Sequence, residues 1–283
     1  MDLITLQWAP PLFHIANMPV RDGHTMVMIG KAAYIFGGEA NSITVNTDGM
    51  PHQILVLKDL WKLDFSGTTP VTTLLNVTGA GPAPRKYHCA TPLGTDAMLI
   101  HGGQSDIDHN FADTWIYNAT LNTWTDVTHP SDSSLIVYGH GCATITASGT
   151  PFRFGGDWSN GGLLSWAPAT GWVHVYAPGP APQMQDIMHQ MTAFGDTLVV
   201  TVQLNHPRSV LLHNEDSQAF YYYNSISDSW TMTNSTSALT SITSTSGSSI
   251  SSTSGSPISP ISHSAFSAVA KGIMMLCLFV YSI

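Results

Sequence analysis

Residues 85–124 read RKYHCATPLGTDAMLIHGGQSDIDHNFADTWIYNATLNTW, and this stretch decides the fold. Short runs of apolar, β-branched and aromatic residues alternate in it with Gly, Pro, Asn and Asp, which is typical of short β-strands separated by turns. Its landmarks, in chain order, are His88, Gly102-Gly103, Trp115, Tyr117 and Trp124. One such small sheet cannot bury its two faces alone, so the stretch predicts a unit that packs against further copies.

The same layout recurs in three other segments of the chain. The landmarks of the first copy are His24, Gly37-Gly38 and Trp61, and those of the third are His140, Gly155-Gly156 and Trp172. The fourth copy has no paired glycines but keeps His189, Tyr223 and Trp230. The histidines at positions 24, 88, 140 and 189 follow one another at intervals of 64, 52 and 49 residues. A recurrence at this period indicates a repeat architecture.

With these residues, the chain resembles the kelch family of β-propellers, which includes galactose-oxidase-like propellers, over about residues 1–232. The resemblance implies an all-β fold with four recognisable blades plus one extra N-terminal strand. We expect the glycine pairs where a side chain would collide with the neighbouring blade, and the tryptophans of the last strands between blades. The histidines should hydrogen-bond loop backbone rather than bind metal. The predicted blades are 9–65, 66–126, 127–174 and 175–232, with 1–8 closing a preceding blade.

Trp8 ends that extra strand and has no place in a ring of four complete blades. One interpretation is a larger ring whose preceding part held two or three blades and a signal peptide, because the opening MDLITLQWAPPLFH has no secretory signal. The other is that four blades suffice. An open blade edge would favour self-association.

The composition changes after the repeats. Residues 231–264 include 21 Ser or Thr and no charged side chain, so we expect 233–264 to be a disordered, O-glycosylated stalk, with a plain linker as the alternative. Residues 265–283 are hydrophobic. They predict a GPI-attachment signal, with Ser254 as the lipidated residue, or a transmembrane helix, with a buried hydrophobic tail as the remaining alternative. Sequons at Asn76, Asn118 and Asn234 fit glycosylation in the same secretory setting.

Three cysteines are too few for a disulfide framework. We expect buried free thiols at Cys89 and Cys142, with a disulfide between them as the alternative. The net charge of −9 and the absence of a Lys/Arg cluster argue against a nucleic-acid partner.

Strand order places the long loops on one face, here called the long-loop face. These are 39–58, 104–112, 157–162 and 204–218 within blades, and 66–84, 125–137 and 173–188 between them. Because loops on a rigid scaffold carry most binding functions, this face is the predicted binding site. Candidate cation ligands in these loops are Asp106, Asp108, His109 and Asp113, and candidate partner-binding residues are Asp157, Trp158, Asn160, His206 and His213.

No catalytic set, cofactor site or trusted metal spacing stands out. The sequence therefore predicts a non-catalytic propeller that binds a protein or glycan at a membrane surface. Two alternatives stay open: a galactose-oxidase-like enzyme, which the resemblance associates with copper and a cysteine–tyrosine cross-link, and a cytoplasmic kelch scaffold.

Overall fold

A computed structural model describes residues 18–45, 51–106, 109–156, 162–182, 189–202 and 219–234. The described part is almost entirely β-structure, with one short 3-10 helix at Pro130–Ser134. Sixteen strands form four antiparallel sheets of four strands each, in chain order within each sheet. The prediction of four all-β blades is confirmed.

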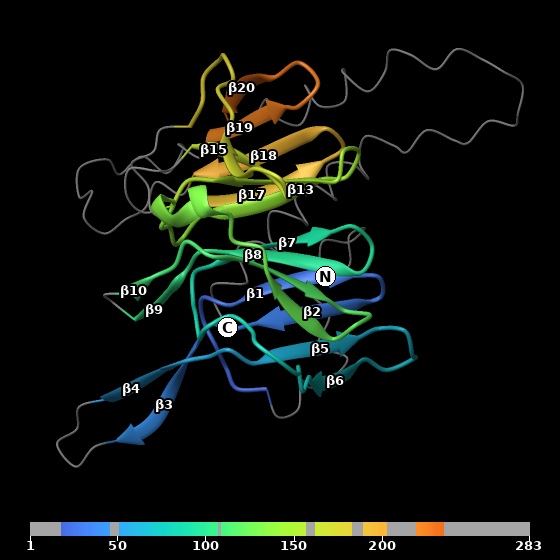
Figure 1. Cartoon of the computed structure of the whole chain (residues 1–283), viewed down its shortest axis with the longest axis vertical. Coiled ribbons are helices and arrows are strands. Elements are labelled where there is room, and N and C mark those ends of the chain that lie inside the picture. The colour runs from blue at the N-terminus through green and yellow to red at the C-terminus, as the bar shows by residue number, and fades with distance from the viewer. Residues whose placement is uncertain are drawn as a thin grey trace, which may run out of the picture.

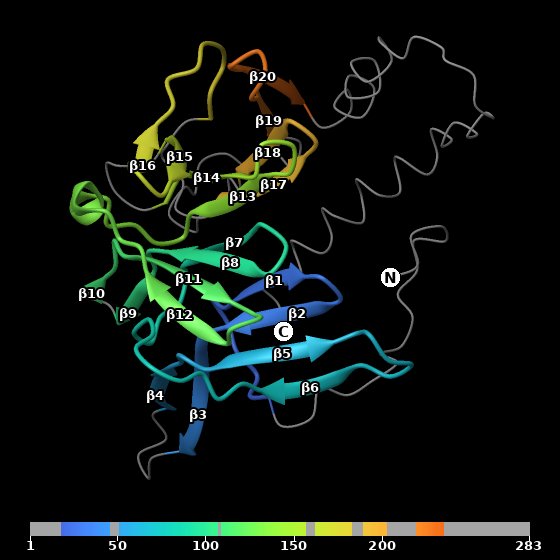
Figure 2. The same cartoon turned by 45° about the vertical axis from the view of Figure 1, so that its right-hand side comes forward.

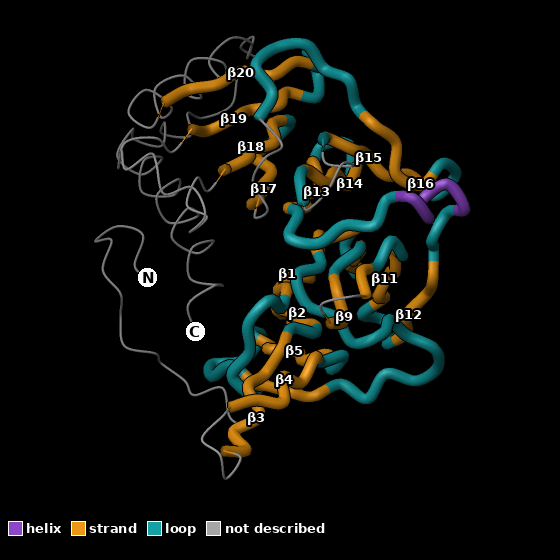
Figure 3. Tube along the Cα trace, turned by 90° about the vertical axis from the view of Figure 1, so that its left-hand side faces the viewer, coloured by secondary structure: helices purple, strands orange, loops and turns teal. Residues whose placement is uncertain are grey.

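The four sheets, or blades, follow one another along the chain and fan out side by side (Figures 1 and 3). Blade 1 contains β1 (Thr25–Ile29), β2 (Ala32–Phe36), β5 (Leu60–Asp64) and β6 (Val71–Leu74). Blade 2 contains β7 (Cys89–Leu93), β8 (Ala97–His101), β11 (Thr114–Asn118) and β12 (Thr123–Asp126). Blade 3 contains β13 (Gly141–Ile145), β14 (Thr150–Phe154), β15 (Leu163–Ala167) and β16 (Gly171–His174). Blade 4 contains β17 (His189–Phe194), β18 (Thr197–Val202), β19 (Ala219–Asn224) and β20 (Ser229–Asn234).

The strand ends coincide with two of the predicted blade limits and differ from two others. The boundaries after residues 126 and 174 coincide with the ends of β12 and β16. The boundary after residue 65 is wrong, because β6 pairs with β5 inside blade 1. Strand β20 also continues to Asn234, two residues past the predicted end of the repeats.

Each of the three interfaces between described blades contains a cluster of apolar side chains. Between blades 1 and 2, Tyr34 and Phe36 pack against Met98 and Ile100. Strands β2 and β8 are buried along their whole length, because they lie second in their sheets with a neighbour on each side. The first strands also contact one another from blade to blade, β1 with β7, β7 with β13, and β13 with β17 (Figure 2).

The tryptophans of the last strands pack against the preceding blade, as predicted. The ring centroid of Trp124 lies 5.0 Å from that of Phe36, and Trp230 lies 5.7 Å from Phe154. Trp172 lies 5.0 Å from His101. Each of these aromatic contacts is worth about 0.5–1.5 kcal/mol beyond the area that it buries. The tryptophans therefore fix each blade to the one before it.

Cys89 and Cys142 form a disulfide, with their Cα atoms 5.5 Å apart. The expectation of two free thiols is wrong. Cys89 begins β7 and Cys142 lies in β13, so the bond joins the first strands of blades 2 and 3. The sequence could not show this, because 53 residues separate the two cysteines and only the packing of consecutive blades brings them together.

Candidate functional site

Two of the predicted long loops fold into hairpins on the long-loop face. The loop after β2 forms β3 (Glu39–Val45) and β4 (Pro51–Val56), and the loop after β8 forms β9 (Gln104–Asp106) and β10 (His109–Asn110). Both hairpins extend from the same side of the blades, on the left in Figure 1. The predicted connection 66–84 is shorter than expected, because it contains β6.

Each hairpin is anchored to the segment that enters its own blade. Isolated bridges pair Asp22 with Glu39 and Lys86 with Gln104. The Lys86 Nζ atom lies 2.5 Å from Glu39, and the Tyr87 hydroxyl donates to Glu39 over 3.1 Å. The root of the first hairpin is therefore tied to blade 2 as well as to blade 1.

A buried arginine holds the base of each hairpin, in an arrangement here called the clasp. In blade 2, Arg85 donates two hydrogen bonds to Asp113 at 2.6 and 2.7 Å and a third to the Gly102 carbonyl at 2.9 Å. The Trp115 indole donates to the same carboxylate over 2.7 Å. Two parallel bonds to a carboxylate are a strong, directional use of arginine.

Blade 1 repeats this clasp. Arg21 donates to Asp59 at 2.7 and 2.8 Å and to the Gly37 carbonyl at 3.0 Å. Burial acts to raise the pKa of Asp59, but the bonds from Arg21 and Trp61 outweigh it and hold that pKa below its usual value. In both blades the clasp therefore fixes the start of the third strand, at the long-loop face.

A row of backbone hydrogen bonds crosses the long-loop face beside the first strands. The Tyr87 amide donates to the Gly23 carbonyl, and the Gly139 amide donates to the Tyr87 carbonyl, both over 2.8 Å. All three residues have positive φ, of 64°, 54° and 69°. The same tight turn thus links blades 1, 2 and 3.

The repeated histidines differ in their partners: His24 has the predicted hydrogen bond with loop backbone, at Arg21, whereas His88 contacts a side chain of the preceding blade. His88 Nε2 lies 2.7 Å from the Thr25 hydroxyl of blade 1. Burial is the main cause that lowers the pKa of His88 well below its usual value, and the charges of Arg85 and His24 add to it. His88 is therefore a neutral contact between blades.

The predicted cation ligands of loop 104–112 do not act as one group among the described residues. Asp113 is part of the clasp, with both carboxylate oxygens bound by Arg85. Asp106 and His109 lie opposite each other in the β9–β10 hairpin, and the His109 ring contacts Phe111. Asp108 lies outside the described residues. The clasp was missed because Arg85 and Asp113 are 28 residues apart.

Other predicted positions lie outside the part of the chain that the structure describes. They are Trp8, Asp157, Trp158, Asn160, His206, His213, Ser254 and the segments 235–264 and 265–283. Among the described residues, no helix is long and apolar enough to span a bilayer.

Two of the three sequons have a described environment. Asn76 is exposed in the connection between blades 1 and 2. Asn118 lies at the tight turn between β11 and β12, where its Oδ1 accepts from the amides of Thr120 and Leu121 and its Nδ2 donates to Asp96. The side chain of Asn234, at the end of β20, is not described.

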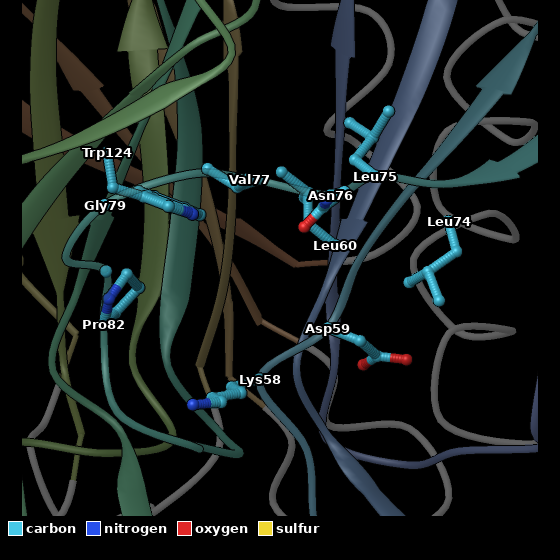
Figure 4. A pocket seen from close by; sticks show the side chains of 11 residues that line it. Lys58, Asp59, Leu60, Leu74, Leu75, Asn76, Val77, Gly79, Pro82 and Trp124 are labelled. Carbon is cyan, nitrogen blue, oxygen red and sulfur yellow. The ribbon is translucent and has the colours of Figure 1, made fainter.

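A groove of 510 Å³ opens between blades 1 and 2 at their outer edge (Figure 4). Polar and apolar atoms contribute nearly equally to its walls, and Lys58 and Asp59 lie at one end, shortly after the β4 segment. The apolar walls come from Leu60, Leu74, Leu75, Val77, Pro82 and Trp124. This groove is not predictable from the sequence, because its walls come from three separate segments.

Arg153 was also missed as a notable residue. It lies in β14, is fully buried, and faces the interface with blade 2, where its guanidinium group lies 5.6 Å from the centre of the Trp172 ring. Burial lowers its pKa to about 10, and the nearby Asp132 acts in the opposite direction. Arg153 therefore stays charged at neutral pH.

Comparison with known families agrees with this architecture. Residues 1–161 match the model of the KLHDC2/KLHL20/DRC7 Kelch-repeats domain. The chain belongs to this Kelch-repeat family. The match covers blades 1 and 2 and the first two strands of blade 3, including both clasps and the disulfide.

The Kelch-repeat chain is similar to several animal proteins. It is 30% identical to human Kelch domain-containing protein 1 over 129 residues, which are 45% of this chain and 29% of that protein. It is 32% identical to the Caenorhabditis elegans host cell factor homolog hcf-1 over 113 residues, 38% of this chain and 14% of that protein. For bovine Kelch domain-containing protein 2 the identity is 24% over 160 residues, 56% and 36% of the two chains. The Kelch-repeat chain thus spans about a third or less of the length of these relatives.

Proposed function

We propose that this Kelch-repeat chain is a non-catalytic binding module that recognises a protein partner through its long-loop face. Kelch-repeat propellers are generally protein-binding domains. The observation that carries the proposal is the pair of hairpins, β3–β4 and β9–β10, which extend from one side of rigid blades and are anchored by the clasps. Preorganised loops of this kind lose little conformational entropy on binding.

The groove between blades 1 and 2 supplies a partly apolar surface next to the first hairpin. Leu55 of β4 is 56% exposed, and Lys58 at the end of the groove is also exposed. An apolar wall beside a charged rim is the usual composition of a protein-binding surface. A protein partner is therefore favoured over the glycan that the sequence also allowed.

We further propose display at a membrane surface through the tail at 265–283. The Cys89–Cys142 disulfide supports this proposal, because disulfides persist in oxidising compartments such as the secretory pathway. The same bond weakens the oxidase alternative, since neither cysteine has a thiol left for a cross-link to tyrosine. Self-association through a blade edge is a further proposal, and gel filtration at several concentrations tests it.

Two exposed leucines on opposite faces give a matched test of the binding face. Leu55 lies in the β3–β4 hairpin, and Leu121, 69% exposed, lies in the β11–β12 turn on the other face. With the full chain as bait and partners identified by mass spectrometry, Leu55→Asp should reduce capture at least tenfold and Leu121→Asp should not. Equal losses from both variants would contradict the proposed face.

Surface display has a separate test. Cells that express the full gene are treated with phospholipase C, and release of a glycosylated propeller into the medium is the expected result for a lipid anchor. An unglycosylated protein that stays inside the cell would support the cytoplasmic scaffold instead.

A further inference from the structure

The interface between blades 2 and 3 carries polar side chains at positions that are apolar in neighbouring blades. The glycine pairs align the second strands, so His101 occupies the position of Phe36 and Phe154. By the same alignment Arg153 occupies the position of Ile35 and Ile100. Both polar residues face the interface between blades 2 and 3. His101 of blade 2 contacts the Trp172 ring, and Arg153 of blade 3 lies near the same ring.

The cysteines belong to this interface. Cys89 occupies in blade 2 the position that Thr25 holds in blade 1, and His140 occupies that of His88. Between blades 1 and 2, His88 contacts Thr25. At the equivalent place between blades 2 and 3, His140 lies beside Cys89. The ligand atoms of Cys89, Cys142 and His140 all lie within 4.8 Å of one another.

Strand register brings two further groups to the cysteines. Cys89 lies opposite His101 in the β7–β8 pair, and Cys142 lies opposite Arg153 in the β13–β14 pair. Side chains that are directly opposite in an antiparallel pair project from the same face of the sheet. The interface therefore gathers two sulfurs, two imidazoles and one guanidinium group.

The guanidinium group has no matching anion in the disulfide form. None of the three Arg153 nitrogens has a hydrogen-bond partner among the residues that the structure describes. The buried carboxylate of Asp132 accepts instead from the backbone amides of His129 and Trp172. A buried, unpaired cation is strongly unfavourable, and two thiolates in place of the disulfide would supply the missing negative charge.

We propose that in the reduced protein this interface binds one thiophilic metal ion, zinc, through the Cys89 and Cys142 thiolates and the His140 imidazole. Zinc bonds of about 2.3 Å to sulfur and about 2.0 Å to nitrogen place tetrahedral ligand atoms roughly 3.5–4 Å apart. The two sulfurs, bonded to each other in the disulfide, must separate by roughly 1.5–2 Å after reduction, and the His140 nitrogen must approach them by about 1 Å or less. Arg153 lies beside Cys142 as a positioning residue that donates to the sulfur.

His101 is the neighbouring candidate for the fourth ligand. Its Nδ1 lies 3.0 Å from the Thr114 hydroxyl, and its Nε2 is buried with no hydrogen-bond partner in the described part of the chain. Zinc-binding histidines usually have one ring nitrogen held by a hydrogen bond while the other bonds the metal. The His101 and His140 ring centroids are 5.4 Å apart.

The disulfide and the metal exclude each other, so the two states interconvert by reduction. A dithiol reductant supplies two electrons to the Cys89–Cys142 bond. The sulfur–sulfur bond breaks and the two sulfurs become thiolates, while the dithiol forms its own disulfide and releases two protons. Zinc then bonds to the thiolates.

The test is zinc binding by the full chain in both redox states. Reduced protein, freed of dithiol under anaerobic conditions, is titrated with zinc against a chromophoric chelator, and we expect one ion per chain. The oxidised protein should bind at least 100-fold more weakly. Cobalt, as a spectroscopic probe, should give a thiolate-to-metal charge-transfer band only in the reduced protein.

Three variants make the test specific. Cys142→Ser should weaken zinc binding at least 100-fold, and Arg153→Met about 10- to 100-fold, as for other groups that support a metal ligand. Cys277→Ser is the matched control and should bind like the wild type. A reduced wild type with native circular dichroism that binds no zinc, or equal affinity for Cys142→Ser, would overturn the proposal. So would a chain that unfolds on reduction and is not restored by zinc.

Discussion

At the scale of single residues, the clasp joins a fully buried cation to the carboxylate that compensates its charge. Arg85 is fully buried and its two strongest bonds go to Asp113, whose side chain is 27% exposed. Removing one member of such a pair leaves a buried charge without its partner, whereas removing an exposed pair changes little.

Asp113→Asn is therefore expected to lower the free energy of unfolding by about 3–5 kcal/mol. Urea denaturation followed by tryptophan fluorescence measures the change. Asp64→Asn is the control, because the side chains of the Lys62–Asp64 pair in β5 are 33% and 30% exposed, whereas Arg85 is fully buried, and it should leave the midpoint nearly unchanged. Equal shifts for the two variants would show that the clasp is no more important than a surface ion pair.

His24 gives a prediction for the pH dependence. Burial, aided by the charge of Arg21, lowers the pKa of His24 below 6.5. The unfolded chain then binds a proton at a higher pH than the folded chain does, so stability is present above about pH 6.5 and is lost as the pH falls. Wild type should lose up to about 1.4 kcal/mol per pH unit below 6.5 from this group, and His24→Gln should show a flatter profile. A steeper profile for the variant would contradict this assignment.

At the scale of elements, the glycine pairs explain why a blade ends its second strand where it does. Gly102 has φ of 65°, and a Cβ atom there would lie 2.5 Å from the Val137 carbonyl of the segment entering blade 3. The following amide, from Gly103, donates to that same carbonyl over 2.8 Å. The pair thus combines a left-handed backbone with a close approach between blades.

Gly102→Ala and Gly94→Ala separate the cost of the left-handed backbone from the cost of the close approach between blades. Gly94 has almost the same φ, 63°, but its Cβ position meets no atom within 4 Å. Gly94→Ala should cost about 1 kcal/mol for the backbone alone, and Gly102→Ala clearly more, because blade 3 must move away. Thermal unfolding by circular dichroism measures both. Similar losses of stability for the two variants would mean that the segment at Val137 moves away from residue 102 at little energetic cost.

The sequence predicted the elements that carry repeated landmarks and missed those that do not. The sequence predicts a loop where β6 lies, because Val71–Leu74 has no tryptophan like Trp124. The hairpins were expected only as long loops, since their residues do not recur from blade to blade. On the candidate site, the sequence predicted the correct face for the hairpins, but the partners of Asp113 and Cys89 depend on contacts across 28 and 53 residues.

At the scale of the whole molecule, the disulfide determines how firmly blades 2 and 3 are held together. Closing a loop of 53 residues restricts the unfolded chain, and the chain-entropy model gives about 4 kcal/mol for a loop of this length. With a metal chelator present, reduction should lower the free energy of unfolding by up to that amount.

Cys89→Ser/Cys142→Ser is the control for reduction. Under oxidising conditions this double variant should unfold like the reduced wild type, and a dithiol should have no further effect on it. If the dithiol destabilises the variant as much as the wild type, the bond between blades is not the cause.

The clasp also bears on how such a chain grows in evolution. Arg21 and Asp59 lie in one repeat, as do Arg85 and Asp113, so duplication of one repeat copies both members together. The duplicated blade would therefore contain a complete clasp at the base of its hairpin. Cys89 and Cys142 come from two repeats, so their bond arises only after two neighbours have diverged from each other. Gene duplication can therefore add blades that each contain a clasp, whereas it does not by itself copy the disulfide between blades 2 and 3.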